Sequence, residues 1–161
     1  MGNLLQGKQI LIVDDEPDVL DTLEQLLSMC RTTRAATFEE AAGLLEDRDF
    51  DVAVLDIMGV DGYKLLEIAG RKNTIAVMLT AHALSPGNIM KSFQGGAASY
   101  LPKEELGEIA AYLEEVLEAK AKGGRFWSRW LERWSSYYDE KFGPNWKDQD
   151  KEFWEKFKCW L

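Results

Sequence analysis

Short apolar segments recur along the first 102 residues of the chain, and each is followed by polar residues. The four clearest segments span 8–13, 51–55, 74–79 and 98–102. A fifth and weaker segment lies around Arg34–Ala36. Runs of about four to eight apolar residues that alternate with helical patterns are typical of a parallel sheet whose faces are both covered by helices. The pattern therefore predicts an α/β fold with five parallel strands.

Segments with helical spacing separate these strands. The predicted helices begin near Pro17, at Thr37, at Gly62, at Ser85–Pro86 and just after Lys103. Thr37 is followed three residues later by Glu40, which is the spacing of a capping box. The fourth helix is expected to stop at Gly95–Gly96, because glycine commonly ends helices. The helix after Lys103 is predicted to be long, with one apolar stripe from Leu106 to Leu117.

A second, smaller unit follows the break at Gly123–Gly124. Residues 126–161 hold all six Trp residues of the chain and 12 of its 18 aromatic residues. Their helical spacing predicts two amphipathic helices joined at Gly143–Pro144, that is, a C-terminal α-helical hairpin. We therefore divide the chain into a body of residues 1–122 and an aromatic-rich extension of residues 123–161. Packing or dimerisation is the first interpretation of the extension, a partner-binding platform the second and a membrane-surface role the third.

Composition and charge exclude several classes of function. The chain has 161 residues and a net charge of −9, and 46% of its residues are hydrophobic. The acidic charge lies in the body, which argues against a nucleic-acid-binding face. No apolar segment approaches the roughly 18 residues that a membrane span needs. Two distant cysteines, Cys30 and Cys159, indicate a reducing compartment, so we expect a cytoplasmic protein for which membrane association is unlikely.

The residues at the strand ends suggest chemistry on phosphate. The carboxyl ends of parallel strands meet at one edge of the sheet, where ligands bind. Asp14, Asp15 and Asp56 would meet there, together with Thr80 and Lys103. Three carboxylates raise one another's pKa in a shared site, and a hard divalent cation such as Mg²⁺ relieves this. Asp56 could then act as a nucleophile towards a phosphoryl group, with Lys103 and Thr80 contacting the phosphoryl oxygens.

Each of these residues also has a simpler interpretation. A single Asp after a strand is usually a turn or a helix cap, and a single Lys is usually solvated. The combination of suitable residues at four strand ends is what favours the functional interpretation.

The chain resembles the receiver domains of bacterial two-component response regulators. The matching stretches are ILIVDDEPDVL (10–20), AVLDIMGVDGYKLL (53–66), VMLTA (77–81) and GAASYLPKEEL (96–106). The resemblance covers roughly residues 7–120. It implies a flavodoxin-like, doubly wound five-stranded parallel sheet of order 2-1-3-4-5.

The resemblance also implies roles for individual residues. Asp56 would accept a phosphoryl group from a sensor histidine kinase or a phosphotransfer protein, with Mg²⁺ as cofactor. Asp14 and Asp15 would be the acidic metal-site pair, Asp56 would also bind the metal, and Lys103 would contact the phosphate. The remaining assignments are Thr80 and Tyr100 as a switch pair and the Met58 backbone carbonyl as a metal ligand. His82 could tune the lifetime of the phosphoryl group, but a solvated loop histidine is the first interpretation of this residue.

Two departures from the family pattern motivate an alternative. The loop from Asp56 to Gly62 is about two residues shorter than usual and lacks its proline, and Glu104 stands where a proline normally follows Lys103. The first hypothesis is a response regulator, not itself an enzyme, that switches protein–protein association through a downstream partner or its own C-terminal helices. The alternative is a receiver-like interaction or dimerisation module that is not phosphorylated. The sequence names neither the kinase nor the downstream target.

Overall fold

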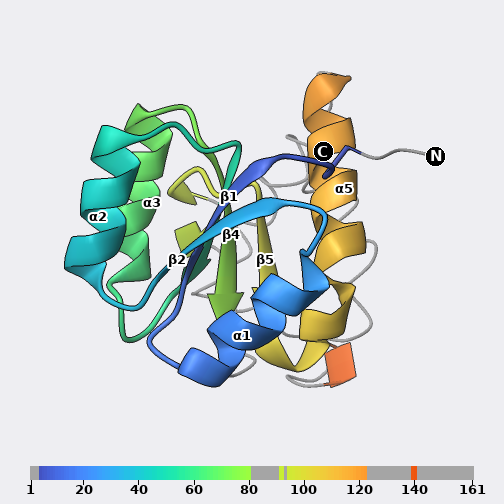
Figure 1. Ribbon diagram of the computed structural model, residues 1–161, viewed down its shortest axis with the longest axis horizontal. Coiled ribbons are helices and arrows are strands. Elements are labelled where there is room, and N and C mark those ends of the chain that lie inside the picture. The colour runs from blue at the N-terminus through green and yellow to red at the C-terminus, as the bar shows by residue number, and fades with distance from the viewer. Residues whose placement is uncertain (1–3, 81–90, 93, 123–138, 141–161) are drawn as a thin grey trace.

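The fold is a five-stranded parallel sheet covered by helices on both faces. A computed structural model of the chain describes residues 4–80, 91–92, 94–122 and 139–140. The strands are β1 (Gln9–Val13), β2 (Arg31–Ala35), β3 (Val52–Asp56), β4 (Ile75–Thr80) and β5 (Ser99–Pro102). The helical elements are α1 (Pro17–Leu26), α2 (Phe38–Asp47), α3 (Gly62–Arg71), the 3₁₀ segment η1 (Lys103–Glu108) and α5 (Ile109–Ala121). All neighbouring strands pair in parallel, in the order β2-β1-β3-β4-β5, which confirms the predicted topology (Figure 1).

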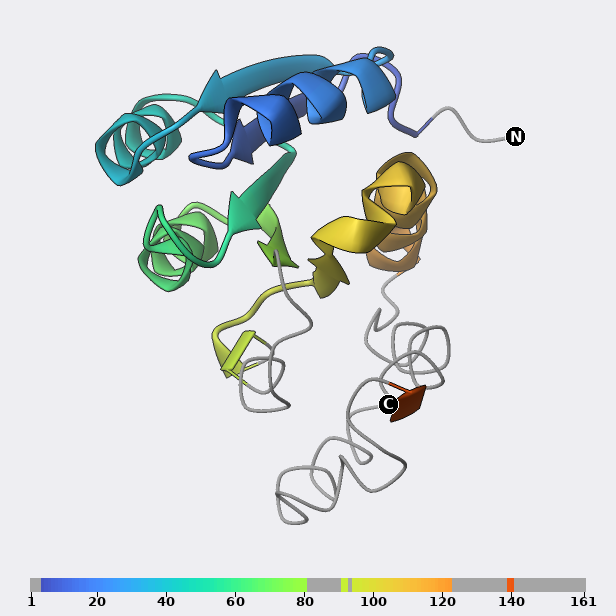
Figure 2. The ribbon, with the colours of Figure 1, turned by 90° about the horizontal axis from the view of Figure 1, so that it is seen from below.

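The helices form two layers on either side of the sheet. Helices α2 and α3 lie together over one face, and α1 and α5 lie over the other, as the two perpendicular views show (Figures 1 and 2). The central strand β3 is buried along its whole length because both of its faces are covered. At the start of α2 the backbone N–H of Glu40 donates to Thr37 Oγ1 at 3.2 Å, and the Glu40 carboxylate accepts from the N–H of Ala36 at 3.0 Å. The predicted capping residues therefore do begin this helix.

Strand β2 begins earlier than the sequence pattern indicates. The prediction placed it around Arg34–Ala36, whereas it spans Arg31–Ala35 and pairs with β1 along that length. It is an edge strand, and only Ala35 is fully buried. An edge strand can carry polar residues along most of its length, so a search for apolar runs finds only its buried end.

The sequence predicts one long helix after Lys103, but the structure has two separate helical elements there. Residues Lys103–Glu108 form a 3₁₀ segment in which Glu105 has non-helical dihedral angles (φ −106°, ψ 22°), and α5 begins only at Ile109. The tighter turns reverse the chain soon after β5 and bring Leu106 into the core. Helix α5 then packs on the sheet through a buried stripe that includes Leu113 and Val116.

Other predicted elements are only partly described. Helical residues precede Gly95, and Gly96 adopts a positive φ of 91°, so the predicted stop at Gly95–Gly96 is confirmed. The predicted helix start at Ser85–Pro86 lies outside the described residues. The same is true of the C-terminal hairpin, except for Asp139 and Glu140, which are helical. Within the described ranges, no helix is both long enough and apolar enough to cross a membrane.

Candidate functional site at the carboxyl ends of the strands

The fold brings the predicted site residues to one edge of the sheet. Asp14 directly follows β1, and Asp56 is the last residue of β3. Thr80 is the last residue of β4, and Lys103 directly follows β5. These four strands are consecutive neighbours in the sheet, with Thr80 paired to Pro102 in the last register position. The predicted meeting of these residues is therefore observed.

The Lys103 amine joins three carboxylates. Its Nζ lies 2.6 Å from Asp14 Oδ2, 3.4 Å from Asp56 Oδ1 and 3.4 Å from Glu16 Oε1. The Asp14 side chain is completely buried, and those of Asp56 and Lys103 are 4% and 10% exposed. The Lys103 ammonium group thus contacts two buried carboxylates at once.

Burial sets the protonation of these groups. Burial raises the pKa of Asp56 most, the Asp14 charge adds to this, and Lys103 opposes it, so that the pKa reaches about 7. Burial likewise raises the pKa of Asp14, despite its contact with Lys103. Burial lowers the pKa of Lys103, but Asp14, Asp56 and Glu16 outweigh this effect and raise it above its ordinary value. Lys103 is therefore charged at neutral pH, whereas Asp56, with a pKa of about 7, is only partly ionised there. A further cation bound beside Asp56 would favour its ionised form.

The acidic residues after β1 suit a divalent cation. One ligand oxygen from each of Asp14, Asp15 and Glu16 lies within 4.8 Å of the others. Asp14 Oδ2 is buried and makes no well-aligned hydrogen bond among the described residues, so its close contact with Lys103 is an ion pair. An oxygen with this free capacity, beside two other carboxylates, fits a hard cation such as Mg²⁺. Asp56 stands outside this three-residue group and is joined to it through Lys103.

Glu16 is a site residue that the sequence analysis did not identify. It contacts Lys103 and belongs to the candidate cation group, and its backbone N–H donates to Asp14 Oδ1 at 2.9 Å. The available signal was its position immediately after Asp14–Asp15 at the start of a helix. Acidic residues are so common at helix starts that this position alone does not indicate a site.

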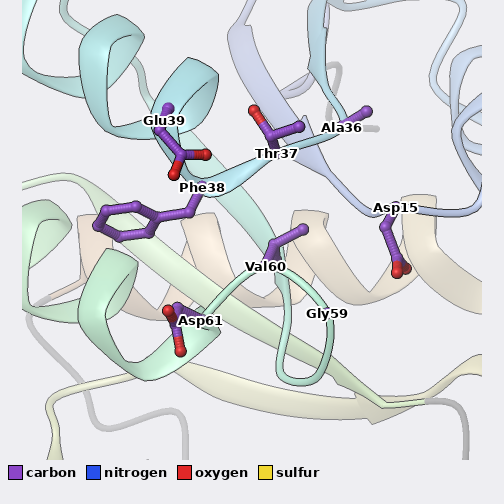
Figure 3. Close-up of a pocket in the computed structure, with 8 residues that line it drawn as sticks. All are labelled: Asp15, Ala36, Thr37, Phe38, Glu39, Gly59, Val60 and Asp61. Carbon is purple, nitrogen blue, oxygen red and sulfur yellow. The ribbon is translucent and has the colours of Figure 1, made fainter.

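The shortened loop after β3 packs against the acidic residues. Gly59 has a positive φ of 86°, and a Cβ atom there would lie 2.5 Å from Asp15 Oδ2. Met58 is 69% exposed. The assignment of its backbone carbonyl as a metal ligand stays a prediction. Beside the loop lies an open hollow of about 560 Å³. It is lined by Asp15, Ala36, Thr37, Phe38, Glu39, Gly59, Val60 and Asp61 (Figure 3).

The proposed switch residues are buried near this site. Thr80 is 2% exposed and Tyr100 is fully buried. The Tyr112 hydroxyl of α5 donates to the Tyr100 carbonyl oxygen at 3.1 Å and also forms a short hydrogen bond with the Ser99 hydroxyl. This buried pair of hydrogen bonds ties β5 to α5. His82 lies outside the described residues.

Comparison with known proteins places the chain among signalling proteins. Residues 10–114 match the family described as response regulator receiver domain. The chain is similar to the two-component response regulator ARR11 of Arabidopsis thaliana, at 30% identity over 91% of this chain and 32% of ARR11. It is similar to ORR24 of Oryza sativa, at 31% identity over 71% of this chain and 19% of ORR24. The chain spans a third or less of the length of these relatives.

Solved structures show the same likeness. The BeF₃-activated receiver domain of DrrB, from Thermotoga maritima, superposes with a TM-score of 0.62 at 28% identity, over 70% of this chain and 98% of that one. A CheY-like receiver domain protein of Methanospirillum hungatei gives a TM-score of 0.59 at 29% identity, over 70% of this chain and 98% of that one.

Proposed function

Because the chain belongs to the response regulator receiver domain family, we propose that it accepts a phosphoryl group on Asp56 from the phosphohistidine of a sensor kinase or phosphotransfer protein. The observation that carries this proposal is the buried contact of one amine, Lys103, with both Asp14 and Asp56. A structural salt bridge needs only one carboxylate for each amine. A second buried carboxylate leaves negative charge that a divalent cation would neutralise, and that cation would in turn attract an anionic phosphoryl group.

The groups present can carry out the transfer. An Asp56 oxygen would attack the phosphorus, forming an O–P bond while the P–N bond to the imidazole breaks, and the imidazole nitrogen would keep the electron pair and take up a proton. Lys103 is placed to contact the incoming oxygens, and the buried Thr80 to donate a hydrogen bond to one of them. Asp14, Asp15 and Glu16 would hold Mg²⁺, which would neutralise phosphoryl charge and orient the group when bound. The protein would be a phosphoacceptor that assists its own reaction, and not an enzyme acting on other molecules.

The output we propose is altered protein–protein association. Thr80 and Tyr100 would act as the two-state element, with Tyr112 linking β5 to α5, the helix that leads into the extension of residues 123–161. The downstream target would be another protein or the extension itself. We place the protein in the cytoplasm, where sensor kinases present their phosphohistidine.

A direct test measures the intact mass of the protein after incubation with a small-molecule phosphodonor and Mg²⁺. We expect a mass gain of one phosphoryl group, which Asp56→Asn abolishes and chelation of Mg²⁺ prevents. Asp61→Asn is the matched control, because Asp61 lies in the same loop with a left-handed φ of 52° that Asn also adopts readily. A wild-type protein that gains no mass, or a gain that survives Asp56→Asn, would favour the non-phosphorylated interaction module instead.

A further inference from the structure

The turn at Gly59 lies directly against the Asp15 carboxylate. A Cβ atom on Gly59 would lie 2.5 Å from Asp15 Oδ2, 2.7 Å from its Cγ and 2.9 Å from its Oδ1. Figure 3 shows the Asp15 side chain pointing toward this turn. Atoms not bonded to each other do not approach a Cβ this closely, so the turn and the carboxylate can share this space only while residue 59 has no side chain.

The turn cannot simply move away to make room. Ile57 and Val60, on either side of it, are buried with exposures of 5% and 1%. Gly62, at the end of the loop, packs so closely on the Asp56 backbone that a Cβ there would lie 2.2 Å from the Asp56 carbonyl oxygen. The loop is thus anchored at both ends, and one of these anchors is the phosphoacceptor itself.

Asp15 has little else to hold it. It is an exposed residue, and within the described part of the chain no hydrogen bond or ion pair fixes its carboxylate. Asp14, in contrast, is buried, accepts a hydrogen bond from the Glu16 N–H and contacts Lys103. The position of the Asp15 oxygens within the acidic group therefore depends on the surface that the Gly59 turn presents.

From these contacts we infer that Gly59 is a positioning residue, which sets the Asp15 carboxylate in place for the divalent cation. This inference rests on the proposed function, because that function is what gives the cation its role. Any side chain at position 59 would displace the Asp15 carboxylate from its present place beside Asp14 and Glu16 and so disturb the cation site. The shortened loop would in this way connect the Asp56 strand end to the cation ligands.

The test is titration of Mg²⁺ into the full chain by calorimetry, which needs no phosphorylation. Gly59→Ala should weaken Mg²⁺ binding by about tenfold or more, the range seen when a residue that orients a ligand is lost. Gly96→Ala is the matched control, because Gly96 has a similar φ of 91° but no atom within 4 Å of its Cβ position. Both variants place Ala at a similar positive φ, and only Gly59→Ala meets Asp15, so Gly96→Ala should bind Mg²⁺ like the wild type. Equal affinities for the two variants, or a wild type that binds no Mg²⁺, would overturn the inference.

A double-mutant cycle covers the case in which Gly59→Ala folds poorly. Asp15→Ala removes the three atoms that lie nearest to the new Cβ. In that background Gly59→Ala should be no more destabilising to urea than Gly96→Ala, as measured by far-ultraviolet circular dichroism. If Gly59→Ala remains the more destabilising substitution there, the inference is wrong. Failure of the proposed function is a different result: the wild type binds Mg²⁺, and Gly59→Ala weakens that binding, but Asp56 takes up no phosphoryl group.

Discussion

At the scale of single residues, burial decides how the site behaves before any ligand is present. Asp56 and Asp14 lie in the protein interior, where one Lys103 charge cannot balance two carboxylates. The pKa of Asp56 is accordingly raised to about 7 from its ordinary value of 3.8. A nucleophile has to be ionised, so binding a cation would also prepare Asp56 for reaction.

This shift predicts how the stability of the chelator-treated protein depends on pH. The folded protein holds the Asp56 proton more tightly than the unfolded chain does. The resulting stabilisation is fully present below pH 3.8 and is lost as the pH rises through about 7. In EDTA the free energy of unfolding should therefore fall between pH 5 and pH 8, by an amount on the order of a few kcal/mol. Urea titrations followed by circular dichroism should show a weaker fall for Asp56→Asn; an equal fall in both proteins would contradict this assignment.

The sequence predicted which residues would meet, but not how closely they would pack. Asp14, Asp56, Thr80 and Lys103 could be placed together because the ends of parallel strands share one edge of a sheet. The contact between Gly59 and Asp15 could not be foreseen, because it depends on the path of a five-residue loop. Local sequence carries little information about such a path.

At the scale of elements, the sequence marks the central strand β3 more clearly than the edge strand β2. Strand β3 is covered on both faces, so its residues form one apolar run that marks its position plainly. Strand β2 is open along one side, and Arg34 there makes ion pairs with Asp21 and Glu24 of α1 at 2.8 and 3.0 Å. The polar residues that suit this edge also conceal it from a search for apolar runs. The sequence did not predict the 3₁₀ segment Lys103–Glu108, because its apolar spacing resembles that of an α-helix.

The link between β5 and α5 can be tested by removing one oxygen atom. Tyr112→Phe keeps the buried ring but deletes the hydroxyl that bonds to Ser99 and to the Tyr100 carbonyl. We expect a loss of about 1–3 kcal/mol in the free energy of unfolding, because buried polar groups on β5 lose their partner. Ser99→Ala completes a double-mutant cycle, in which the two substitutions should be clearly non-additive. Strictly additive effects would mean that the two hydroxyl groups are not coupled.

At the scale of the whole molecule, the chain combines an acidic receiver domain with an extension of different composition. The family match covers residues 10–114 and stops before the aromatic-rich segment begins. Helix α5 runs to Ala121, so the extension starts directly from the element that Tyr112 ties to β5. The chain therefore passes from Lys103, directly after β5, through η1 and α5 into the extension.

The distribution of tryptophan makes this route observable. All six Trp residues lie in residues 126–161, so indole emission reports on the extension alone. If the signal passes through β5 and α5, the emission should shift when the phosphodonor and Mg²⁺ are added, and it should stay constant in Asp56→Asn. An unchanged emission spectrum, together with an unchanged sedimentation profile, would show that phosphorylation of the receiver domain does not alter the environment or the association of the extension.

The strand order also determines when the site becomes complete during synthesis. Asp14 follows β1 and Asp56 ends β3, and both leave the ribosome well before Lys103, which follows the last strand at the far edge. A nascent chain that pairs β1 with β3 early therefore brings two carboxylates together without their counter-ion. Addition of β5 supplies that charge, so the last strand to be made completes the sheet and brings in the amine that contacts both carboxylates.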